Sequence, residues 1–436
     1  MSFEKISVVG LGYVGLPLAL EFAKAGLIVY GIEQNPKKVE MVNKGISYID
    51  DVKSEELSEV VNKGVLKAFV DFESVKDSDA VIICVPTPLG AHKEPDISYI
   101  VNVTNEISKF LREGQLIVLE STTYPGTTEE VVLPILEKSG LKGGKDFYLA
   151  FSPERVDPGN KKFTTKDIPK VVGGIDEVST EKAAELYSLI VPQVHKVSSP
   201  KVAEMEKLLE NIFRLVNISF INELAILCGK MGIDVWEVIE AASTKPYGFM
   251  PFYPGPGVGG HCISIDPFYL SWKAKEYDLG VRFIELAGEI NDNMPRYIVQ
   301  LVMEALNKHK KAVNGSKILV IGVAYKPNVG DPRESPALKI IPLLEELNGE
   351  VEFYDPYISE IKIESNKTKE VKYMKSCVLD EEKVRNADCV LIITDHDNID
   401  YEMIFKNSKL IVDTRNALRK RGIKVDDRVT ILGVAK

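Results

Sequence analysis

The sequence predicts an α/β protein with two doubly wound parallel-sheet domains joined by a helical middle that contains one long central helix. Strand-like and helix-like patterns alternate from the first residues, give way to helix near Ser199, and restart near Gly315. Alternating strands and helices are typical of a parallel sheet. We expect an N-terminal domain over residues 1–198, a helical domain over 199–310 and a C-terminal domain over 311–436.

The N-terminal pattern begins with the β-run KISVVGLG, which ends in glycines. The amphipathic stretch GLPLALEFAKAG follows and is closed by Gly26, a signal for a helix C-terminus. Further β-runs, separated by helical stretches, are LIVYGIEQN, AVIICVP, LIVLEST and FYLAFSPE.

The middle pattern is helical. KVAEMEKLLENIFRLVNISFINELAILCGKMG has apolar residues at helical spacing and no internal glycine before Gly229, so it predicts a helix well above the average length of about 11–12 residues. Helix continues to about Ala242, a Pro/Gly-rich loop runs from Lys245 to Pro267, and more helix extends to about Lys310. The later β-runs are SKILVIGVAYKP, EVEFYDP, ADCVLIITD and KLIVDTRN.

Composition narrows the class of protein. Of 436 residues, 45% are hydrophobic and 27% charged, as in soluble globular proteins. The net charge of −10 argues against nucleic-acid binding, although local cations can still bind an anionic substrate. No uninterrupted apolar run reaches the ~18 residues of a membrane span. The first residues run straight into a strand and leave no room for a signal peptide, so we expect a cytoplasmic protein without a membrane partner.

The segment Gly10-Leu11-Gly12-Tyr13-Val14-Gly15 follows a β-run and opens a helix, as in the Rossmann-like dinucleotide turn. Glu33 ends the second β-run. A carboxylate there accepts both ribose hydroxyls and repels a 2′-phosphate, which favours NAD over NADP. The alternative interpretation is a glycine-rich turn that binds nothing.

A second glycine-rich segment, from Pro254 to Pro267, contains Cys262, and Asp266 follows it by four residues. A buried structural cysteine is the alternative to a nucleophile, but a loop dense in glycine is a poor place for core packing. We expect Cys262 to be catalytic. The remaining cysteines, which we expect to be structural, are Cys84, Cys228, Cys377 and Cys389.

Two further groups are candidates for catalysis. Lys207 and Asn211, four residues apart on the long helix, share a face and could bind an oxyanion; the alternative for Lys207 is a solvated surface lysine. Ser152-Pro153-Glu154-Arg155 lies just past what we take as the last strand of the first domain, where ligands of such sheets bind. Glu154 could activate water, or be a surface carboxylate.

No metal site is expected. The five histidines lack ligand spacing. Asp395-His396-Asp397 is better interpreted as a strand end followed by a helix cap.

Taken together, the motifs resemble those of the UDP-glucose/GDP-mannose dehydrogenase family, the nucleotide-sugar 6-dehydrogenases. The resemblance covers nearly the whole chain, and the motifs come in the family's order. They are GLGYVGLPLA, VPTP (Val85 to Pro88), ESTTYPGTT (Glu120 to Thr128), SPER, EKLLEN, PGPGVGGHC and AYKPNVGDPRESPA (Ala324 to Ala337).

The resemblance implies an N-terminal NAD-binding domain, a central helix that forms a homodimer, and a C-terminal domain that binds a UDP-sugar substrate. It implies that Cys262 is the nucleophile, that Lys207 and Asn211 stabilise the oxyanion with support from Asp266, and that Glu154 activates water near Thr122. The implied NAD contacts are Gly10, Gly12, Tyr13, Val14, Gly15, Glu33, Pro86, Thr87, Ser121 and Arg333. The implied substrate contacts are Glu154, Arg155, Lys207, Asn211, Gly259, Lys326 and Arg415.

The implied reaction is a four-electron oxidation of a C6 alcohol to a uronic acid through a thiohemiacetal and a thioester on Cys262. SPERVDPG stands where glucose-oxidising members usually have NPEFLxEG, which favours a UDP-N-acetylhexosamine, and UDP-N-acetylglucosamine above UDP-N-acetylmannosamine. UDP-glucose stays an alternative. The rivals are a non-catalytic nucleotide-binding protein and a two-electron alcohol dehydrogenase.

Overall fold

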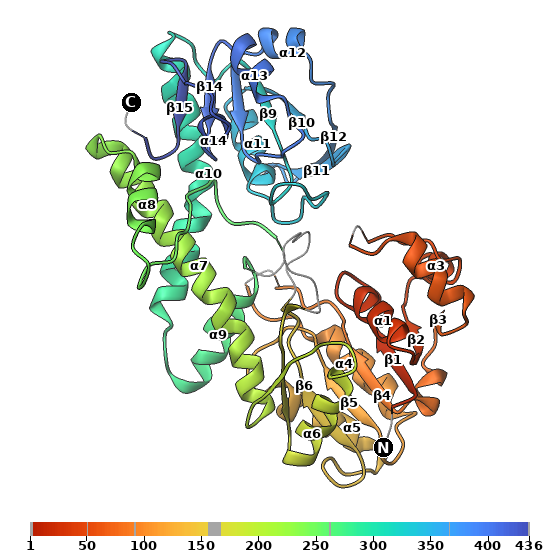
Figure 1. The fold of residues 1–436 in the computed structure, drawn as a ribbon. Helices are drawn as coiled ribbons and strands as arrows, with labels where there is room; N and C mark the ends of the chain where they lie inside the picture. Colours follow the sequence, from red (N-terminus) through yellow and green to blue (C-terminus); the bar gives the residue numbers. More distant parts are fainter. Residues whose placement is uncertain are drawn as a thin grey trace. The chain divides into compact units, whose positions relative to one another are not determined.

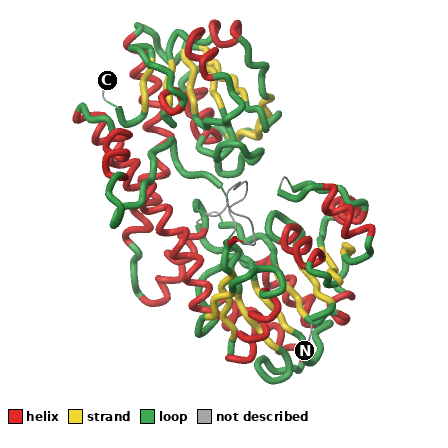
Figure 2. Tube along the Cα trace, viewed as in Figure 1, coloured by secondary structure: helices red, strands yellow, loops and turns green. Residues whose placement is uncertain are grey.

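A computed structural model describes residues 3–49, 51–90, 93–155, 167–260, 263–365 and 367–434 (Figures 1 and 2). The chain divides into two compact units. The first contains Met1–Glu210 and Phe268–Gly280, and the second contains Asn211–Pro267 and Val281–Lys436. The boundary falls inside one long helix, α7 (Pro200–Met231).

The first unit is built on a sheet in the order β3-β2-β1-β4-β5-β6-β7-β8. Its strands run parallel except for β6 and β7, which pair antiparallel. The bounds are β1 Lys5–Val9, β2 Ile28–Ile32, β3 Leu66–Phe69, β4 Ala80–Ile83, β5 Leu116–Leu119, β6 Tyr148–Phe151, β7 Lys170–Gly174 and β8 Val194–Lys196.

Both faces of this sheet are covered, because successive strand residues point to opposite faces. In β4, Ala80 and Ile82 pack with helices α1, α3 and α6, whereas Val81 and Ile83 pack with α4 and α5, and Figure 1 shows these helices around the sheet. The bounds are α1 Gly15–Lys24, α2 Pro36–Asn43, α3 Ser54–Asn62, η1 Glu73–Asp77, α4 Ser98–Ser108, η2 Thr128–Val132, α5 Leu133–Leu136, η3 Glu137–Ser139 and α6 Glu177–Tyr187.

One expectation about this sheet was wrong. The β-run that ends before Ser152 is β6, and β7 and β8 follow it in the same sheet. The motif from Ser152 to Arg155 therefore follows an interior strand. The sequence did not reveal β7 because its run, KVVGG, has only five residues and ends in two glycines, which are depleted in strands.

The helical middle confirms the long central helix, since α7 has 32 residues. The helix continues two residues past Gly229, to Met231, and the loop after Lys245 ends where α9 begins at Asp266. The other helices are α8 Val235–Ser243, α9 Asp266–Ala274, η5 Lys275–Tyr277 and α10 Arg282–Lys308.

Helix α7 is long and apolar enough to cross a membrane when judged by length and composition alone. An 18-residue window within it has a mean hydropathy of 1.5, and 33% of that window is buried. A single helix of this kind is weak evidence for a membrane span, because core helices of soluble proteins have the same composition.

The second unit contains a parallel sheet in the order β10-β9-β13-β14-β15 and an antiparallel hairpin of β11 and β12. Ile318 and Val320 of β9 pack with α10 and α11, while Leu319 and Ile321 face the opposite core. The bounds are β9 Lys317–Ile321, β10 Glu350–Tyr354, β11 Glu360–Glu364, β12 Val371–Lys375, β13 Cys389–Ile392, β14 Ile411–Asp413, β15 Val429–Ile431, α11 Ala337–Glu346, α12 Glu381–Asn386, α13 Tyr401–Asn407 and α14 Ala417–Lys420.

These sheets confirm the expected fold class. One local interpretation was wrong: the segment Asp395–Asp397 does not cap a helix. Asp400 is the N-cap of α13, and its side chain accepts a hydrogen bond from the amide of Met403 at 2.9 Å.

Candidate active site

The three glycines of the first turn have different surroundings. Gly10 has φ +90°, and a Cβ there would lie 2.4 Å from the carbonyl oxygen of Cys84. A Cβ on Gly15 would lie 1.8 Å from the carbonyl oxygen of Gly10, whereas a Cβ on Gly12 would meet nothing within 4 Å. Gly10 and Gly15 are thus required by the fold, and the space beside Gly12 is open at the N-terminus of α1. This cradle fits the pyrophosphate of NAD.

Glu33 follows β2 directly. Its carboxylate accepts hydrogen bonds from the amide of Leu11 at 3.3 Å and from the amide of Asn35 at 3.0 Å. The hydroxyl of Tyr48 donates to the carbonyl oxygen of Leu11 at 2.7 Å. The carboxylate is therefore held beside the glycine turn, where a ribose would be recognised.

The expected cofactor residues after β4 and β5 share one edge of the sheet, because these strands are neighbours. The hydroxyl oxygen of Ser121 accepts a hydrogen bond from the amide of Val85 at 2.9 Å. The carbonyl oxygen of Thr87 accepts one from the hydroxyl of Tyr269. The loop that carries Pro86 is thereby fixed at both ends, and Thr122, partly buried, follows Ser121. Tyr13, which lies in the glycine turn from Gly10 to Gly15, is 42% exposed.

Glu154 is not a surface carboxylate. One carboxylate oxygen accepts from the ammonium of Lys170 at 2.9 Å, and the other accepts from the amide of Arg155 at 2.9 Å. Its main-chain carbonyl oxygen accepts a hydrogen bond from the ammonium of Lys207 at 2.5 Å. Lys207 is itself buried, so the interpretation of a solvated lysine was wrong. The structure brings together two residues that the sequence placed 53 positions apart.

Sequence reasoning missed the buried group behind Glu154. Lys170, the first residue of β7, pairs with both Glu120 and Glu154. The hydroxyl of Tyr187 donates to Glu120 at 2.9 Å. The available signal was a charged residue at the end of an apolar strand run, Glu120 after LIVL and Lys170 before VVGG.

Arg155 is engaged by acidic residues of α7. Its guanidinium donates to Glu210 at 2.5 Å and to the carbonyl oxygen of Pro169 at 2.8 Å, and it lies 3.4 Å from Glu206. Burial, followed by the neighbouring carboxylate of Glu210, raises the pKa of Glu206 to about 7.

In the second unit, the amide nitrogen of Asn211 donates to the carboxylate of Asp266 at 2.6 Å. Both side chains are buried. Asp266 is the first residue of α9, which follows the glycine-rich loop. Asp266, which was expected to support oxyanion binding, is therefore in contact with Asn211. Cys262, the expected nucleophile, and His261 lie outside the described residues.

Side-chain amides shape the glycine-rich loop. The side-chain oxygen of Asn222 accepts from the amide of Gly255 at 2.9 Å, and that of Asn291 accepts from the amide of Val258 at 2.6 Å. Sequence reasoning missed both asparagines, since each lies in a long helix far from the loop in sequence. A Cβ on Gly259 would lie 2.7 Å from the carbonyl oxygen of Glu334, so the loop has no room for a side chain there.

The expected substrate contacts of the second unit lie in its loops. Arg415 follows β14, and its guanidinium lies so close to Gly255 that a Cβ there would be 2.3 Å away. The structure thus joins Arg415 to the glycine-rich loop. Lys326 lies 5.9 Å from the ring centre of Tyr325. Arg333, which is an expected NAD contact, donates to Asp331 of its own loop at 2.7 Å.

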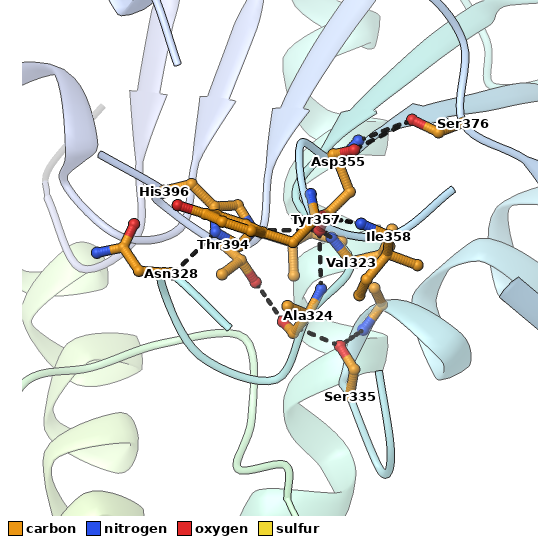
Figure 3. A network of polar contacts seen from close by, with 12 residues as sticks. Val323, Ala324, Asn328, Ser335, Asp355, Tyr357, Ile358, Ser376, Thr394 and His396 are labelled. Atoms are coloured by element: carbon orange, nitrogen blue, oxygen red, sulfur yellow. Dashed lines mark hydrogen bonds and ion pairs between the residues drawn. The ribbon is translucent and has the colours of Figure 1, made fainter. Parts of the chain in front are cut away.

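The buried carboxylate of Asp355 connects the loops that follow β9, β10 and β13 of the second unit (Figure 3). Asp355 accepts hydrogen bonds from the amides of Val323 at 2.7 Å and Ala324 at 3.1 Å, and Nε2 of His396 lies 3.1 Å from it. Nδ1 of His396 accepts from the amide of Asn328 at 2.9 Å. His396 therefore donates through Nε2 and ties the loop that carries Lys326 to the ends of β10 and β13.

The four described cysteines carry free thiols. Burial raises the pKa of Cys84, Cys377 and Cys389, the last to about 12. Such thiols are poor nucleophiles at neutral pH. Among the residues that the structure describes, no cluster of His, Cys, Asp and Glu side chains could hold a metal ion.

Comparison with known proteins agrees with this geometry. Residues 4–191, 201–293 and 319–420 match the NAD binding, central and UDP binding domains of the UDP-glucose/GDP-mannose dehydrogenase family. UDP-N-acetyl-D-glucosamine 6-dehydrogenase of Pseudomonas aeruginosa is 40% identical over 81% of this chain and 83% of its own. UDP-N-acetyl-D-mannosamine dehydrogenase of Methanocaldococcus jannaschii is 37% identical over 99% and 97%.

A solved structure of UDP-D-ManNAc dehydrogenase from Pyrococcus horikoshii covers 98% of this chain and 99% of its own, with 34% identity and a TM-score of 0.87. The glycine turn, the UDP binding match and the near-complete coverage agree. The chain therefore belongs to the UDP-glucose/GDP-mannose dehydrogenase family and is an NAD-dependent nucleotide-sugar dehydrogenase.

Proposed function

We propose that this enzyme oxidises the C6 alcohol of a UDP-N-acetylhexosamine, preferentially UDP-N-acetylglucosamine, to the uronic acid in a four-electron reaction. The observation that carries the proposal is the hydrogen bond between Lys207 and Glu154. Through the main-chain carbonyl oxygen, it places a cation suited to an oxyanion beside the residue whose carboxylate is suited to activating water, and a reaction that ends in hydrolysis needs both.

The mechanism assigns one task to each residue. NAD, when bound, accepts one hydride in each of the two oxidations. The thiolate of Cys262 adds to the aldehyde carbon, and Lys207 and Asn211 donate to the resulting oxyanion. Asp266 holds the amide of Asn211 in place. Glu154 removes a proton from the water that hydrolyses the thioester, near Thr122, and the thiolate leaves.

The proposed sugar preference rests on relatives and on two segments of the chain. A UDP-N-acetylglucosamine enzyme is 40% identical to this chain, while UDP-N-acetylmannosamine enzymes match at 36–37% over nearly the whole chain. UDP-N-acetylmannosamine is therefore the second candidate. We assign the preference to the SPERVDPG segment, of which Val156 to Gly159 lie outside the described residues, and to the loop from Lys245 to Pro254. Tyr247 and Met250 of that loop are 73% and 61% exposed.

A substrate panel tests this function. UDP-glucose and the UDP-linked N-acetyl derivatives of glucosamine, mannosamine and galactosamine are each supplied with saturating NAD. We expect UDP-N-acetylglucosamine to be oxidised fastest, with two NADH formed per sugar. One NADH per sugar would rule out the four-electron reaction, and faster turnover of UDP-glucose would rule out the sugar assignment.

The nucleophile has its own test. Cys262→Ala should reduce overall turnover by several orders of magnitude, on the order of 10³-fold or more. When the UDP-sugar 6-aldehyde is supplied directly, the variant should still fail to form acid efficiently. Oxidation of the aldehyde at the wild-type rate would show that Cys262 is structural.

We also propose a homodimer formed through α7. Large apolar side chains are exposed along this helix at intervals that follow its turns: Met205, Leu209, Phe213, Phe220, Leu227 and Met231. A second copy would bury such a stripe. Light scattering should give a dimer, and Leu209→Asp with Phe220→Asp should give a monomer. A wild-type monomer with full activity at micromolar concentration would contradict this assignment.

In this proposal residues 1–198 bind NAD, 199–310 form the dimer and 311–436 bind the UDP-sugar. The product is a UDP-linked uronic acid, which we place in polysaccharide biosynthesis in the cytoplasm.

A further inference from the structure

The buried group behind Glu154 contains charged side chains that have no task in the two oxidations. Lys170, Glu120 and Tyr187 come from β7, the end of β5 and α6, and all three are buried. The ammonium of Lys170 contacts both carboxylates, with 2.9 Å to Glu154, and the hydroxyl of Tyr187 holds the second oxygen of Glu120. Side chains from β7, the end of β5 and α6 thus meet around the ammonium of Lys170.

The cluster places Lys170 between two acids of different accessibility. The side chain of Glu120 is fully buried, whereas 17% of the Glu154 side chain is exposed. Burial of Glu120, opposed by the charge of Lys170, raises the pKa of Glu120 to about 7. Burial of Lys170 is outweighed by the two carboxylates, which raise its pKa above the usual value. Lys170 therefore remains a cation at every pH at which the enzyme would work.

We infer that Lys170 is a positioning residue for Glu154: held by Glu120 and Tyr187, it fixes the carboxylate that activates water in thioester hydrolysis and keeps it ionised. This inference rests on the proposed function of Glu154. It adds a buried support, placed outside the reacting atoms, to a step in which Glu154 accepts the proton of the water.

The chemistry of hydrolysis explains why such a support is useful. The water oxygen forms a bond to the thioester carbon, its proton passes to Glu154, and the carbon–sulfur bond breaks as the thiolate leaves. A protonated or rotated Glu154 cannot accept that proton. A carboxylate that loses an ion-paired ammonium takes up a proton at higher pH and has more rotational freedom. The two oxidations need no base at this position, so they should be insensitive to Lys170.

Other charged groups also face Glu154. Lys207 donates to its carbonyl oxygen and not to its carboxylate. Arg155 is directed to Glu210, and Cys84 is a buried neutral thiol whose pKa burial raises well above its usual value. The ammonium of Lys170 lies 2.9 Å from the carboxylate of Glu154 and brings a positive charge to it.

The test separates hydrolysis from oxidation. Lys170→Met removes the ammonium and keeps most of the side-chain length. In a single turnover followed by mass spectrometry of the intact protein, we expect NADH to form at the wild-type rate while a covalent sugar-nucleotide adduct persists. Its hydrolysis should slow by about tenfold or more. The acid limb of the hydrolysis rate should move up by about one pH unit, and Lys170→Arg should restore most of the rate.

A double variant guards against unfolding. Glu120→Gln with Lys170→Met removes one charge of each sign, so the buried net charge is unchanged while Glu154 still lacks its cation. It should accumulate the adduct as well. Lys182→Met is the matched control, since this lysine of α6 lies over the ring of Tyr148 at 4.7 Å, outside the cluster, and should behave as wild type.

Glu154→Gln is measured in parallel so that two failures can be told apart. If Glu154→Gln accumulates adduct but the folded double variant hydrolyses it at the wild-type rate and pH dependence, Lys170 does not position Glu154 and the inference is overturned. If Glu154→Gln forms no adduct, the proposed role of Glu154 is wrong as well.

Discussion

The ammonium of Lys207 lies 2.5 Å from the main-chain carbonyl oxygen of Glu154. A side chain expected to hold an oxyanion therefore also fixes the backbone of the residue expected to activate water. Asn211, one helical turn later, is instead held by Asp266 at 2.6 Å. Lys207 and Asn211, the two oxyanion candidates, thus have different neighbours. Their variants should therefore have different effects on oxidation and on hydrolysis.

Lys207→Ala should slow both oxidation of the aldehyde and hydrolysis of the thioester, each by about a hundredfold, because it removes an oxyanion donor and the support of Glu154. Asn211→Ala should slow aldehyde oxidation by a comparable factor and leave hydrolysis nearly unchanged. Single-turnover measurements of NADH and of the covalent adduct resolve the two steps. Equal effects of both variants on hydrolysis would contradict this division.

Variants of the glycine turn should distinguish effects on folding from effects on cofactor binding. Gly15→Ala should destabilise the protein by about 2–4 kcal/mol, because the new Cβ would overlap a backbone carbonyl. Gly12→Ala has open space, so its stability should change by less than about 1 kcal/mol while NAD affinity falls about tenfold or more. Thermal unfolding with and without NAD measures both effects. A strongly destabilised Gly12→Ala would show that Gly12 serves the fold.

Glu33 should determine the choice between NAD and NADP. The ratio of kcat/KM for NAD to that for NADP should be roughly ten to a hundred or more, from lost charge-assisted hydrogen bonds and charge repulsion. Glu33→Gln should reduce this ratio. It should also weaken NAD binding, because the carboxylate accepts from the amide of Leu11 in the glycine turn. Equal efficiency of wild type with both cofactors would refute the assignment.

Stability should depend on pH through Glu206. Its pKa is raised to about 7 in the fold by burial and by Glu210, above the usual value of a free glutamate. Its contribution to stability is therefore greatest below about pH 4.5 and is lost as pH rises to about 7. Glu206→Gln should be more stable than wild type at pH 8 by on the order of 1 kcal/mol, and the gain should vanish at pH 5. Glu185→Gln, at an exposed position of α6, is the control and should show no such trend.

Asp355→Asn should destabilise the protein by about 2–4 kcal/mol, because an amide nitrogen would face backbone donors. The wild-type carboxylate also accepts from the amides of Tyr357 and Ile358. Burial opposes ionisation, but His396 and the backbone donors hold the pKa of Asp355 below its usual value. Its contribution is thus present above about pH 4 and lost in acid. Denaturant unfolding measures the difference, and the exposed Asp427→Asn should be neutral.

Periodicity and glycine placement predicted the two sheets, the long helix and the first glycine turn, because these depend on local patterns that a single sequence displays. The sequence missed the strands β3, β7, β8, β11, β12 and β15, each of which has only three to five residues. Runs of this length offer few positions over which a period of two residues can be recognised.

The place of a candidate residue in the fold was predictable where a motif names the residue, as for Gly10, Glu33 and Glu154. It was not predictable where partners come from distant elements. The role of Lys170 is evident only from its contact with Glu120, and that of Asn222 only from its contact with Gly255. Such pairings depend on which strands and helices become neighbours, and no local pattern in either partner reveals them.

The return of residues 268–280 to the first unit has a consequence for protein synthesis. The hydroxyl of Tyr269 bonds the loop at Thr87, and Lys273 pairs with Glu130 at 2.8 Å, so the NAD-binding unit lacks part of its cover until this segment is made. At ribosomal speeds of about 5–20 residues per second, the 70 residues from 210 to 280 take roughly 4–14 s. The contacts that Tyr269 and Lys273 make within the first unit therefore form only after residues 211–267 of the second unit have been translated.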